Sequence, residues 1–435
     1  MSGSMWRHGD FMKLWTAQTI SLVGTQVTAL ALPLAAILQL NASAFEVGLL
    51  AAILYLPFLV VGLPAGAIVD RLRRRPVLIA TNVGRALLLM VVPVAAWLGV
   101  LNLALLYPVA FFVGVLSVFS DVALQSYLPS LVAGDQLVTA NARLELSYSG
   151  SQLAGPGIGG ALVQLLTAPI AILADVLSYV GATVLLLFVR HREPRPQGTA
   201  GMVDLARLGW LGGSQARRLR ADMAAGLRFV WGHRLIRPLA LATGTANFFY
   251  LFGMTGAVLT LFAVRQLHMT PVLIGVALLL GNIGAVAGSL VSTWFLAHVR
   301  FGTLMVIAPL SAAVAIALMA LATPVTALAF LALGVIVGEF GTTVYDIAQI
   351  SLRQAVTPPE LLGRMNATVR FINWGAIPVG AFAGGVLAQL IGLRPVLWIA
   401  AAGCLLPTVW LLRSAVSGLR VMPGTEVSES IGAVT

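Results

Sequence analysis

The chain has 435 residues, of which 59% are hydrophobic and only 9% are charged, whereas about a quarter of the residues in soluble domains are charged. This composition excludes a soluble fold and predicts an all-α integral membrane protein, because lipid accepts only backbone whose hydrogen bonds are satisfied within the segment. The net charge of +11 would suggest nucleic acid as the partner of a soluble protein. In a membrane protein the positions of the charges matter more than their sum, so we expect no nucleic acid.

Apolar runs of roughly 20 to 27 residues predict transmembrane helices. The first run is too long for the core of a signal peptide, so we expect it to remain as the first helix. Twelve helices are predicted, over residues 14–38, 46–69, 77–99, 102–124, 144–166, 168–189, 239–264, 271–296, 303–322, 326–348, 367–391 and 394–412.

The clearest boundary is the stretch from Gly66 to Arg75, where an apolar run stops and Asp70 and four arginines stand within six residues. Lysine and arginine accumulate on the cytoplasmic side of a membrane. With the N-terminus inside, all but three of the 26 basic residues lie on that side; Arg265 and Arg394 fall outside, and Arg85 lies within the third helix. We therefore predict a multi-pass protein of the cell membrane with both termini in the cytoplasm.

The longest polar segment, residues 190–238, contains ten arginines and separates two sets of six helices. Its second half, residues 215–231, has apolar residues at helical spacing with arginines between them, which is typical of an amphipathic helix on an anionic membrane surface. A plain solvated linker is the alternative. The predicted divisions are an N-terminal six-helix bundle (1–189), this linker, a C-terminal six-helix bundle (239–412) and a cytoplasmic tail (413–435).

The two sets of helices contain an internal repeat. At an offset of 225 residues, Asp121-Val-Ala matches Asp346-Ile-Ala, Asn141-Ala142 matches Asn366-Ala367, Gly155 matches Gly380, and Gly159-Gly160 matches Gly384-Gly385. Two six-helix halves related by duplication are an architecture of secondary transporters, in which the substrate path lies between the halves.

Two motifs resemble those of the major facilitator superfamily. The pattern Gly66-x-x-x-Asp70-Arg71-x-x-Arg74-Arg75 resembles its loop signature, and Gly155-Pro156-Gly157-Ile158-Gly159-Gly160 resembles the glycine-proline signature of its drug antiporters. The sequence around Pro129 and Asn141-Ala142, after Asp121, is similar to that of one branch of the family, the bacterial exporters for macrolides and for siderophores of the enterobactin type. The resemblance implies the major facilitator fold, with twelve helices in two six-helix bundles.

Three departures from the family pattern stand out. Arg73 replaces the loop glycine, and residues 101–120 carry no charge where many drug/proton antiporters have an arginine. The corresponding loop of the second half has only Arg300, so the gate that the resemblance implies is asymmetric.

The resemblance implies that Gly66, Asp70, Arg71, Arg74 and Asp121 form this gate. Asp70 is expected to pair with Arg74 and to face Asp121 and the amino end of the eleventh helix, whose partial positive charge favours a carboxylate. Such pairs would hold the outward-open state and break when a carboxylate is protonated. The alternative is an arginine cluster that only sets the topology.

Three charged residues fall inside predicted helices. An unpaired Arg85 would cost at least about 2.5 kcal/mol in lipid, so we expect a partner, with Asp121 as the first candidate; the alternative is that Arg85 reaches the lipid headgroups. Glu339 lies some 13 residues, or roughly 20 Å, along the tenth helix, where we expect it to be protonated or paired. It is the first candidate for proton coupling or for recognition of a cationic substrate, Asp175 is the second, and a structural hydrogen bond is the alternative.

Small residues dominate one face of the fifth helix. Gly155, Gly159 and Gly160 allow a neighbouring helix to approach closely, and Pro156 predicts a kink. The resemblance adds a role in closing the cavity to ion leak.

Polar and aromatic residues at mid-helix depth predict the lining of a substrate cavity. A large apolar pocket with a few polar groups suits bulky lipophilic ligands, although for each aromatic residue lipid contact is the alternative. The predicted substrate-binding residues are Gln26, Asn247, Tyr250, Phe340, Asn373 and Trp374.

The predicted function is that of a secondary active transporter, a proton-coupled exporter of bulky lipophilic or amphipathic molecules of the drug, macrolide or siderophore class, working by alternating access. No nucleotide-binding loop with Gly-Lys-Ser/Thr occurs, so we expect the proton gradient rather than ATP or a cofactor to supply energy. We expect protons, substrate and lipids as partners and a monomeric chain. An uptake transporter or a lipid flippase on the same fold is the alternative. An enzyme is not expected, because no histidine falls inside a predicted helix, and no metal site is predicted.

Overall fold

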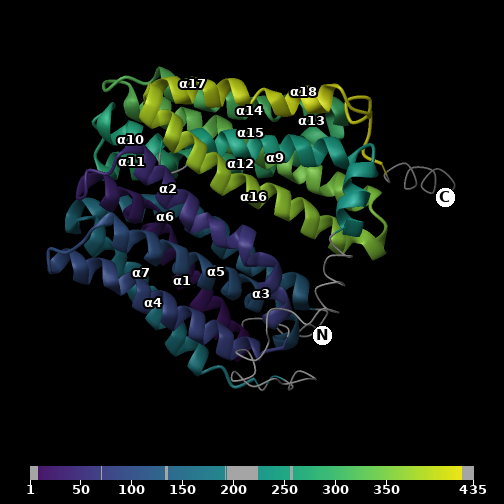
Figure 1. Cartoon of the computed structure of the whole chain (residues 1–435). Helices are drawn as coiled ribbons and strands as arrows, with labels where there is room; N and C mark the ends of the chain where they lie inside the picture. Colours follow the sequence, from purple (N-terminus) through teal and green to yellow (C-terminus); the bar gives the residue numbers. More distant parts are fainter. Residues whose placement is uncertain are drawn as a thin grey trace. The chain divides into compact units, whose positions relative to one another are not determined.

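The computed structural model describes residues 8–69, 71–132, 136–191, 193, 224–254 and 258–423. Within these residues the regular structure is helical and no strand occurs. The chain forms two compact units, here called unit 1 and unit 2 (Figure 1). Unit 1 takes its described residues from 1–207 and 260–279, and unit 2 takes its described residues from 208–259 and 280–435.

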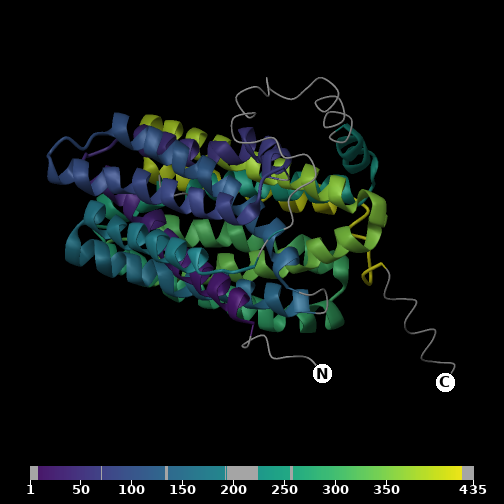
Figure 2. The same cartoon turned by 90° about the horizontal axis from the view of Figure 1, so that it is seen from below.

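Unit 1 is built around α1, which packs against α6 and α7, while α4 packs against α5 and α7 (Figure 2). Its helices are α1 (Gly9–Leu38), α2 (Ala44–Val60), α3 (Gly62–Val69), α4 (Arg74–Trp97), α5 (Leu103–Leu131), α6 (Leu137–Leu166) and α7 (Ala168–Leu187), together with most of α10 (Val258–Arg265) and α11 (Pro271–Gly281).

Unit 2 is built around α9 and α15: α16 and α18 pack against α9, while α12 and α14 pack against α15. Its helices are α9 (Ile236–Met254), α12 (Ile283–His298), α13 (Phe301–Ile307), α14 (Leu310–Leu321), α15 (Ala327–Val356), α16 (Pro359–Ile391), α17 (Leu393–Gly403) and α18 (Leu406–Leu412). Residues 224–232 are also helical, and the rest of the predicted amphipathic segment, 215–223, lies outside the described residues.

The predicted spans correspond to single helices or to two consecutive ones. Nine helical spans in the described part of the chain are long and apolar enough to cross a membrane. The span 46–69 is divided into α2 and α3 at Val61, three residues before Pro64, and the span 303–322 is divided into α13 and α14 just before Leu310, next to Pro309. Proline lacks the backbone N–H that the preceding turn would bind, which explains why continuous apolar runs contain these breaks.

Several helices extend beyond the predicted apolar runs. The α6 helix begins at Leu137 rather than 144, α15 continues to Val356 rather than 348, and α16 begins at Pro359 rather than 367. The prediction was short at these ends because hydropathy reports the thickness of the lipid, whereas the backbone hydrogen bonds of a helix continue into its polar extension. The predicted division into bundles, linker and tail stays a prediction.

The internal repeat is visible in the two hydrophobic cores. In unit 1, Leu14 and Ala17 of α1 pack with Ala123 and Tyr127 of α5 and with Leu186 of α7. The residues 225 positions later are in the core of unit 2: Leu239, Ala242, Ala348, Leu352 and Leu411. Duplication therefore accounts for the core that joins the first, fourth and sixth spans of each repeat.

The repeat also preserves an unusual helix cap. The Nδ1 atom of His8 accepts a hydrogen bond from the backbone N–H of Phe11 at 3.1 Å, at the start of α1. At the same offset, Nδ1 of His233 accepts from the N–H of Ile236 at 3.3 Å and from that of Leu235 at 3.2 Å, at the start of α9. Both histidines satisfy amide groups that the first turn of a helix leaves without a partner.

Candidate functional site

The predicted gate loop joins α3 to α4. Asp70 lies outside the described residues, so its pairing stays a prediction. Arg73 is the N-cap of α4 with φ −70° and ψ 127°, which is a conformation open to any L-residue. The backbone therefore does not require the glycine that Arg73 replaces. Gly66 lies on α3 and Arg71 stands two residues after the end of that helix. Arg74 is the first residue of α4, and Asp121 lies on α5.

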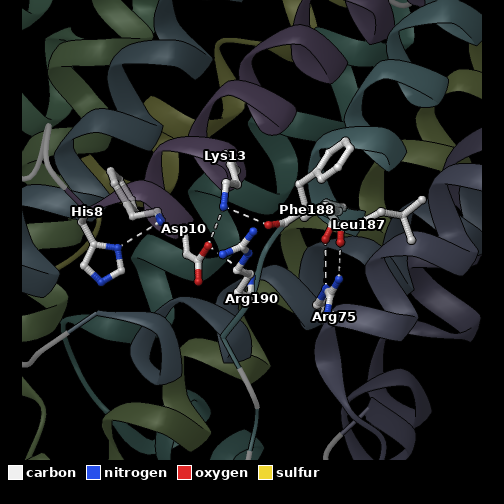
Figure 3. Close-up of polar contacts among 9 residues, drawn as sticks. His8, Asp10, Lys13, Arg75, Leu187, Phe188 and Arg190 are labelled. Carbon is white, nitrogen blue, oxygen red and sulfur yellow. Dashed lines mark hydrogen bonds and ion pairs between the residues drawn. The ribbon is translucent and has the colours of Figure 1, made fainter.

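The end of this loop is tied to α7 by hydrogen bonds (Figure 3). Arg75 donates from Nε to the carbonyl of Leu186 at 2.9 Å and from Nη2 to that of Leu187 at 2.7 Å, and Nζ of Lys13 donates to the carbonyl of Phe188 at 2.8 Å. These carbonyls belong to the last turn of α7 and the residue after it, which lack intrahelical partners and carry partial negative charge. The two cations therefore cap α7 and fix it to α1 and α4.

Arg85 is buried inside unit 1, with 7% of its surface exposed. It donates hydrogen bonds to the side chains of Asn82 at 2.6 Å, Ser120 at 3.1 Å and Tyr179 at 3.3 Å, and its guanidinium carbon lies 4.3 Å from the centre of the Tyr179 ring. Asp121 is not among these three acceptors. The guanidinium is thus held by neutral groups and a cation–π contact rather than reaching out to lipid headgroups.

Asp175 is the more deeply buried of the two predicted coupling acids, with 1% of its surface exposed. It accepts hydrogen bonds from the hydroxyl of Thr28 at 2.6 Å and from that of Ser178 at 3.0 Å. A Cβ added at Gly24 of α1 would overlap Ser178 and lie 2.6 Å from a carboxylate oxygen of Asp175. Gly24 therefore lets α1 and α7 enclose this carboxylate.

Glu339 of unit 2 has a more open environment. It is partly buried on α15 and accepts a hydrogen bond at 3.1 Å from the hydroxyl of Tyr250 on α9. This bond brings together two residues that the sequence predicted for different roles, one for coupling and one for substrate binding. Both roles stay predictions.

The glycines of the α6 motif face two different helices. Gly155 and Gly159 lie against α1, where added Cβ atoms would overlap the side chain of Gln26 and lie 3.3 Å from the Cα of Val27. Gly160 lies against α11, where a Cβ would be 3.1 Å from the Cα of Gly275. Close helix packing is therefore present on two sides of the motif, and Pro156 lies inside α6 without ending it.

The repeat mates of two of these glycines form the same kind of seam in unit 2. Cβ atoms added at Gly380 and Gly384 of α16 would overlap the carbonyl oxygens of Phe248 and Phe252 of α9. Phe252 stands 225 residues after Val27, so the Gly159 contact and the Gly384 contact are equivalent.

Of the predicted substrate-binding residues, Gln26 is the one in unit 1. Its side-chain amide donates to the side-chain oxygen of Gln152 on α6, and Gln152 donates to the hydroxyl of Tyr148 at 3.1 Å. Gln26 thus belongs to a polar chain across the α1–α6 seam, with Gly155 beside it.

The other predicted binding residues lie in unit 2 and are partly buried. Asn247 donates to the backbone carbonyl of Asn373 at 3.4 Å, and the side-chain oxygen of Asn373 is buried without a hydrogen-bond partner in the described part of the chain. The guanidinium of Arg370 lies 5.5 Å from the ring centre of Trp374. Phe340 packs edge-on against Phe295, with ring centres 6.3 Å apart, so helix packing accounts for its position.

The partners of the buried charges were not found from the sequence. Tyr179 and Asp175 stand four residues apart on α7, and Asn82 and Arg85 stand three apart on α4, which are spacings that place side chains on one helix face. Those spacings were the sequence signal from which the partners could have been predicted. Within the described ranges no group of three or more His, Cys, Asp or Glu residues is arranged to hold a metal ion.

The fold and the buried polar groups together define a polytopic helical transporter. The family model for the Major Facilitator Superfamily matches residues 14–377, which is most of the chain. The protein therefore belongs to the major facilitator superfamily, as the two motifs predicted, and it is a membrane transporter rather than an enzyme.

Among curated relatives, the chain is similar to efflux proteins. It is 28% identical to the multidrug efflux pump Tap of Mycolicibacterium fortuitum over 393 residues, covering 89% of this chain and 91% of that protein. It is 22% identical to macrolide efflux protein A of Streptococcus pyogenes, covering 94% of this chain and 96% of that protein.

Solved structures support the fold. A bacterial homologue of the iron transporter ferroportin, crystallised in an inward-facing state, matches 94% of this chain and 99% of its own with a TM-score of 0.72 and 16% identity. The nucleoside transporter NupG matches with a TM-score of 0.68 and 14% identity. At these identities the likeness shows the fold alone.

Proposed function

We propose that the protein is a proton-coupled exporter of bulky lipophilic or amphipathic small molecules that works by alternating access. The observation that carries this proposal is the Glu339–Tyr250 pair, a carboxylate and a phenol from two helices of unit 2 that meet inside apolar spans. Export as the direction, and drugs or macrolides as the substrate class, are supported by the names of the similar efflux proteins.

The two acids differ in their suitability as a proton carrier. A coupling carboxylate has to exchange its proton with water during each transport cycle. Asp175 is enclosed, with 1% of its surface exposed and two hydroxyl donors in place. Glu339 is only partly buried, and it stands about 18 Å from the start of α15 at 1.5 Å per residue. We therefore assign the coupling proton to Glu339.

Unit 2 also contains groups that suit the proposed substrates. Tyr250 and Trp374 supply aromatic surface, while Glu339 and the side-chain oxygen of Asn373 supply hydrogen-bond acceptors. A mostly apolar site with a few polar groups binds large lipophilic molecules and orients them. In alternating access, protonation of Glu339 would neutralise the site and release a bound amphipathic cation.

The test is an efflux screen of lipophilic antibiotics and siderophores in an efflux-deficient host. We expect Glu339→Gln to abolish proton-driven export while the protein still inserts, because the amide keeps the size of the side chain but cannot carry the proton. Glu46→Gln is the matched control: Glu46 closes a capping box with Ser43 at the start of α2, and glutamine serves the same cap. Equal export by wild type and Glu339→Gln would remove Glu339 from the coupling role.

Vesicles of defined orientation then determine the direction. An outward-directed transporter accumulates substrate in inverted vesicles when a proton gradient is imposed. Accumulation only in right-side-out vesicles would indicate uptake, and movement of labelled phospholipid without transport of soluble substrate would indicate a lipid flippase.

A further inference from the structure

A cavity of about 360 Å³ lies in unit 1 beside the predicted gate loop. Its lining comes from the start of α4 and from the segment that follows α7: Arg73, Arg75, Pro76, His191 and Glu193. Arg73 is the residue that replaces the glycine of the family loop motif, and the helix cap gives no reason for an arginine there.

Two of the lining residues, Arg75 and Glu193, already form hydrogen bonds within the protein. Arg75 is held through Nε and Nη2 by the carbonyls of α7 (Figure 3), and its backbone N–H donates to Oε2 of Glu193 at 3.3 Å. These bonds fix Arg75 and one oxygen of Glu193, so the loop and the segment after α7 form a defined wall of the cavity.

Two polar atoms in the lining have no partner. The Oε1 atom of Glu193 and the Nε2 atom of His191 are both buried and make no hydrogen bond within the described residues. A buried polar group without a partner costs about 1–3 kcal/mol. Their presence in the wall of a cavity points to a ligand that supplies the missing bonds.

The required ligand has two kinds of polar group. An ionised carboxylate only accepts, so Oε1 of Glu193 needs a hydrogen-bond donor. The side chain of Arg73 is exposed and only donates, so it is available to an acceptor, and arginine suits phosphate. Nε2 of His191 serves either group, depending on its tautomer.

The position of the cavity favours a lipid over a soluble anion as its ligand. The cavity lies where α4 begins and α7 ends, at the boundary between the apolar spans and the basic segment. Next to it, Leu187 and Phe188 have 57% and 65% of their surfaces exposed, which gives acyl chains an apolar surface beside the polar lining.

We propose that this cavity binds the headgroup of a phospholipid that carries hydrogen-bond donors beside its phosphate, with Arg73 holding the phosphate and Glu193 accepting from the donor. Amine and glycerol headgroups have such donors, whereas choline has none. The arginine at the motif glycine position is then part of a lipid site, and this assignment does not depend on the coupling role of Glu339.

The test is native mass spectrometry of the full-length protein in mild detergent with an equimolar mixture of phosphatidylethanolamine, phosphatidylglycerol and phosphatidylcholine of identical acyl chains. We expect wild type to retain the first two about tenfold better than phosphatidylcholine, the difference expected for one hydrogen bond to a charged group. Retention without preference among the three would overturn the proposal.

Two variants separate the two polar contacts. Arg73→Gln should weaken retention of all three lipids about tenfold, because the phosphate is common to them. Glu193→Leu should remove only the preference over phosphatidylcholine, with melting curves to confirm that it folds. Arg300→Gln, the same charge change at an exposed arginine of unit 2, should leave retention and preference unchanged; an equal loss there would mean unspecific attraction and contradict the site.

A soluble competitor identifies the source of the phosphate. Millimolar inorganic phosphate or glycerophosphoethanolamine should leave the bound lipid in place. Displacement by either would assign the cavity to a soluble phosphate compound and overturn the lipid assignment.

Discussion

Unit 1 and unit 2 have equivalent cores and caps but enclose their acids differently. In unit 1, Asp175 is enclosed by Thr28 and Ser178, and the buried Arg85 donates a hydrogen bond to Tyr179 on the same helix as Asp175, α7. In unit 2, Glu339 is partly buried and has the hydroxyl of Tyr250 as its hydrogen-bond donor. Neither acid has an acidic mate in the other repeat, because Gly114 and Ala400 occupy the positions at the same offset.

The difference separates two uses of a charge inside a membrane protein. A carboxylate with fixed donors and a buried cation nearby stabilises the packing of α1, α4 and α7, and moving a proton there would disturb several bonds at once. A carboxylate with one donor and partial access can change its protonation state at lower cost. This difference supports the proposal that Glu339 of unit 2, rather than Asp175 of unit 1, carries the coupling proton.

The largest expected effect comes from removing the carboxylate of unit 1. Asp175→Leu leaves two hydroxyls without their acceptor and removes a carboxylate whose charge attracts the buried Arg85, so we expect the protein to lose about 3 kcal/mol of stability. Glu339→Leu removes one hydrogen bond and should cost about 1 kcal/mol. Thermal unfolding in detergent, followed by tryptophan fluorescence, measures both.

A double variant tests whether the charge of Arg85 contributes to the stability that Asp175→Leu removes. In an Arg85→Met background the charge is gone, so Asp175→Leu should cost clearly less than it does in wild type, as expected for coupled groups. If the cost of Asp175→Leu were the same in both backgrounds, the two charges would be independent, and Arg85 would not contribute to the stabilising effect of Asp175.

The glycine seams are the feature that the units share, and α6 provides its own control. Gly155→Ala would place a methyl group on the side chain of Gln26, and we expect a loss of about 2 kcal/mol from overpacking. Gly150 is exposed on the same helix and has nothing within 4 Å of an added Cβ in the described part of the chain. Gly150→Ala should therefore stabilise α6 by up to about 1 kcal/mol. Equal melting temperatures for the two variants would show that the seam is loosely packed.

The framework of the molecule was predictable because it follows from strong, local signals. Long apolar runs predict spans, and the repeat at offset 225 predicted that the two halves would be equivalent, which the paired cores around Leu14 and Leu239 illustrate. The breaks at Val61 and before Leu310 were missed because hydropathy averages over the prolines that cause them.

The polar interior was less predictable because neutral groups carry most of it. A search for opposite charges suggested Asp121 as the partner of Arg85, whereas the guanidinium is held by Asn82, Ser120 and Tyr179. Hydroxyl and amide side chains are common in membrane helices, and only the fold decides which of them face a buried charge. The cavity behind Arg73 likewise depends on His191 and Glu193, which are distant from it in sequence.

The smallest expected effect concerns the two histidine caps, and it sharpens the comparison because the caps are equivalent by descent. Burial lowers the pKa of His233, and its Nδ1 atom has to stay unprotonated to accept from the N–H groups of Leu235 and Ile236. The unfolded chain therefore binds this proton more readily than the folded chain. The stabilisation by the cap is complete above the unfolded-state pKa of about 6.5 and is lost as the pH falls through the lower folded-state value.

His233→Asn replaces the cap with one that accepts hydrogen bonds without titrating in this range. Between pH 7.5 and pH 5, wild type should lose thermal stability relative to His233→Asn. The loss should be smaller than the loss that Gly155→Ala causes at constant pH. His8→Asn, the same change at the equivalent cap of unit 1, is the matched comparison. A wild-type pH profile parallel to that of His233→Asn would contradict the prediction, because a proton on Nδ1 excludes the bonds from Leu235 and Ile236 and should cost stability.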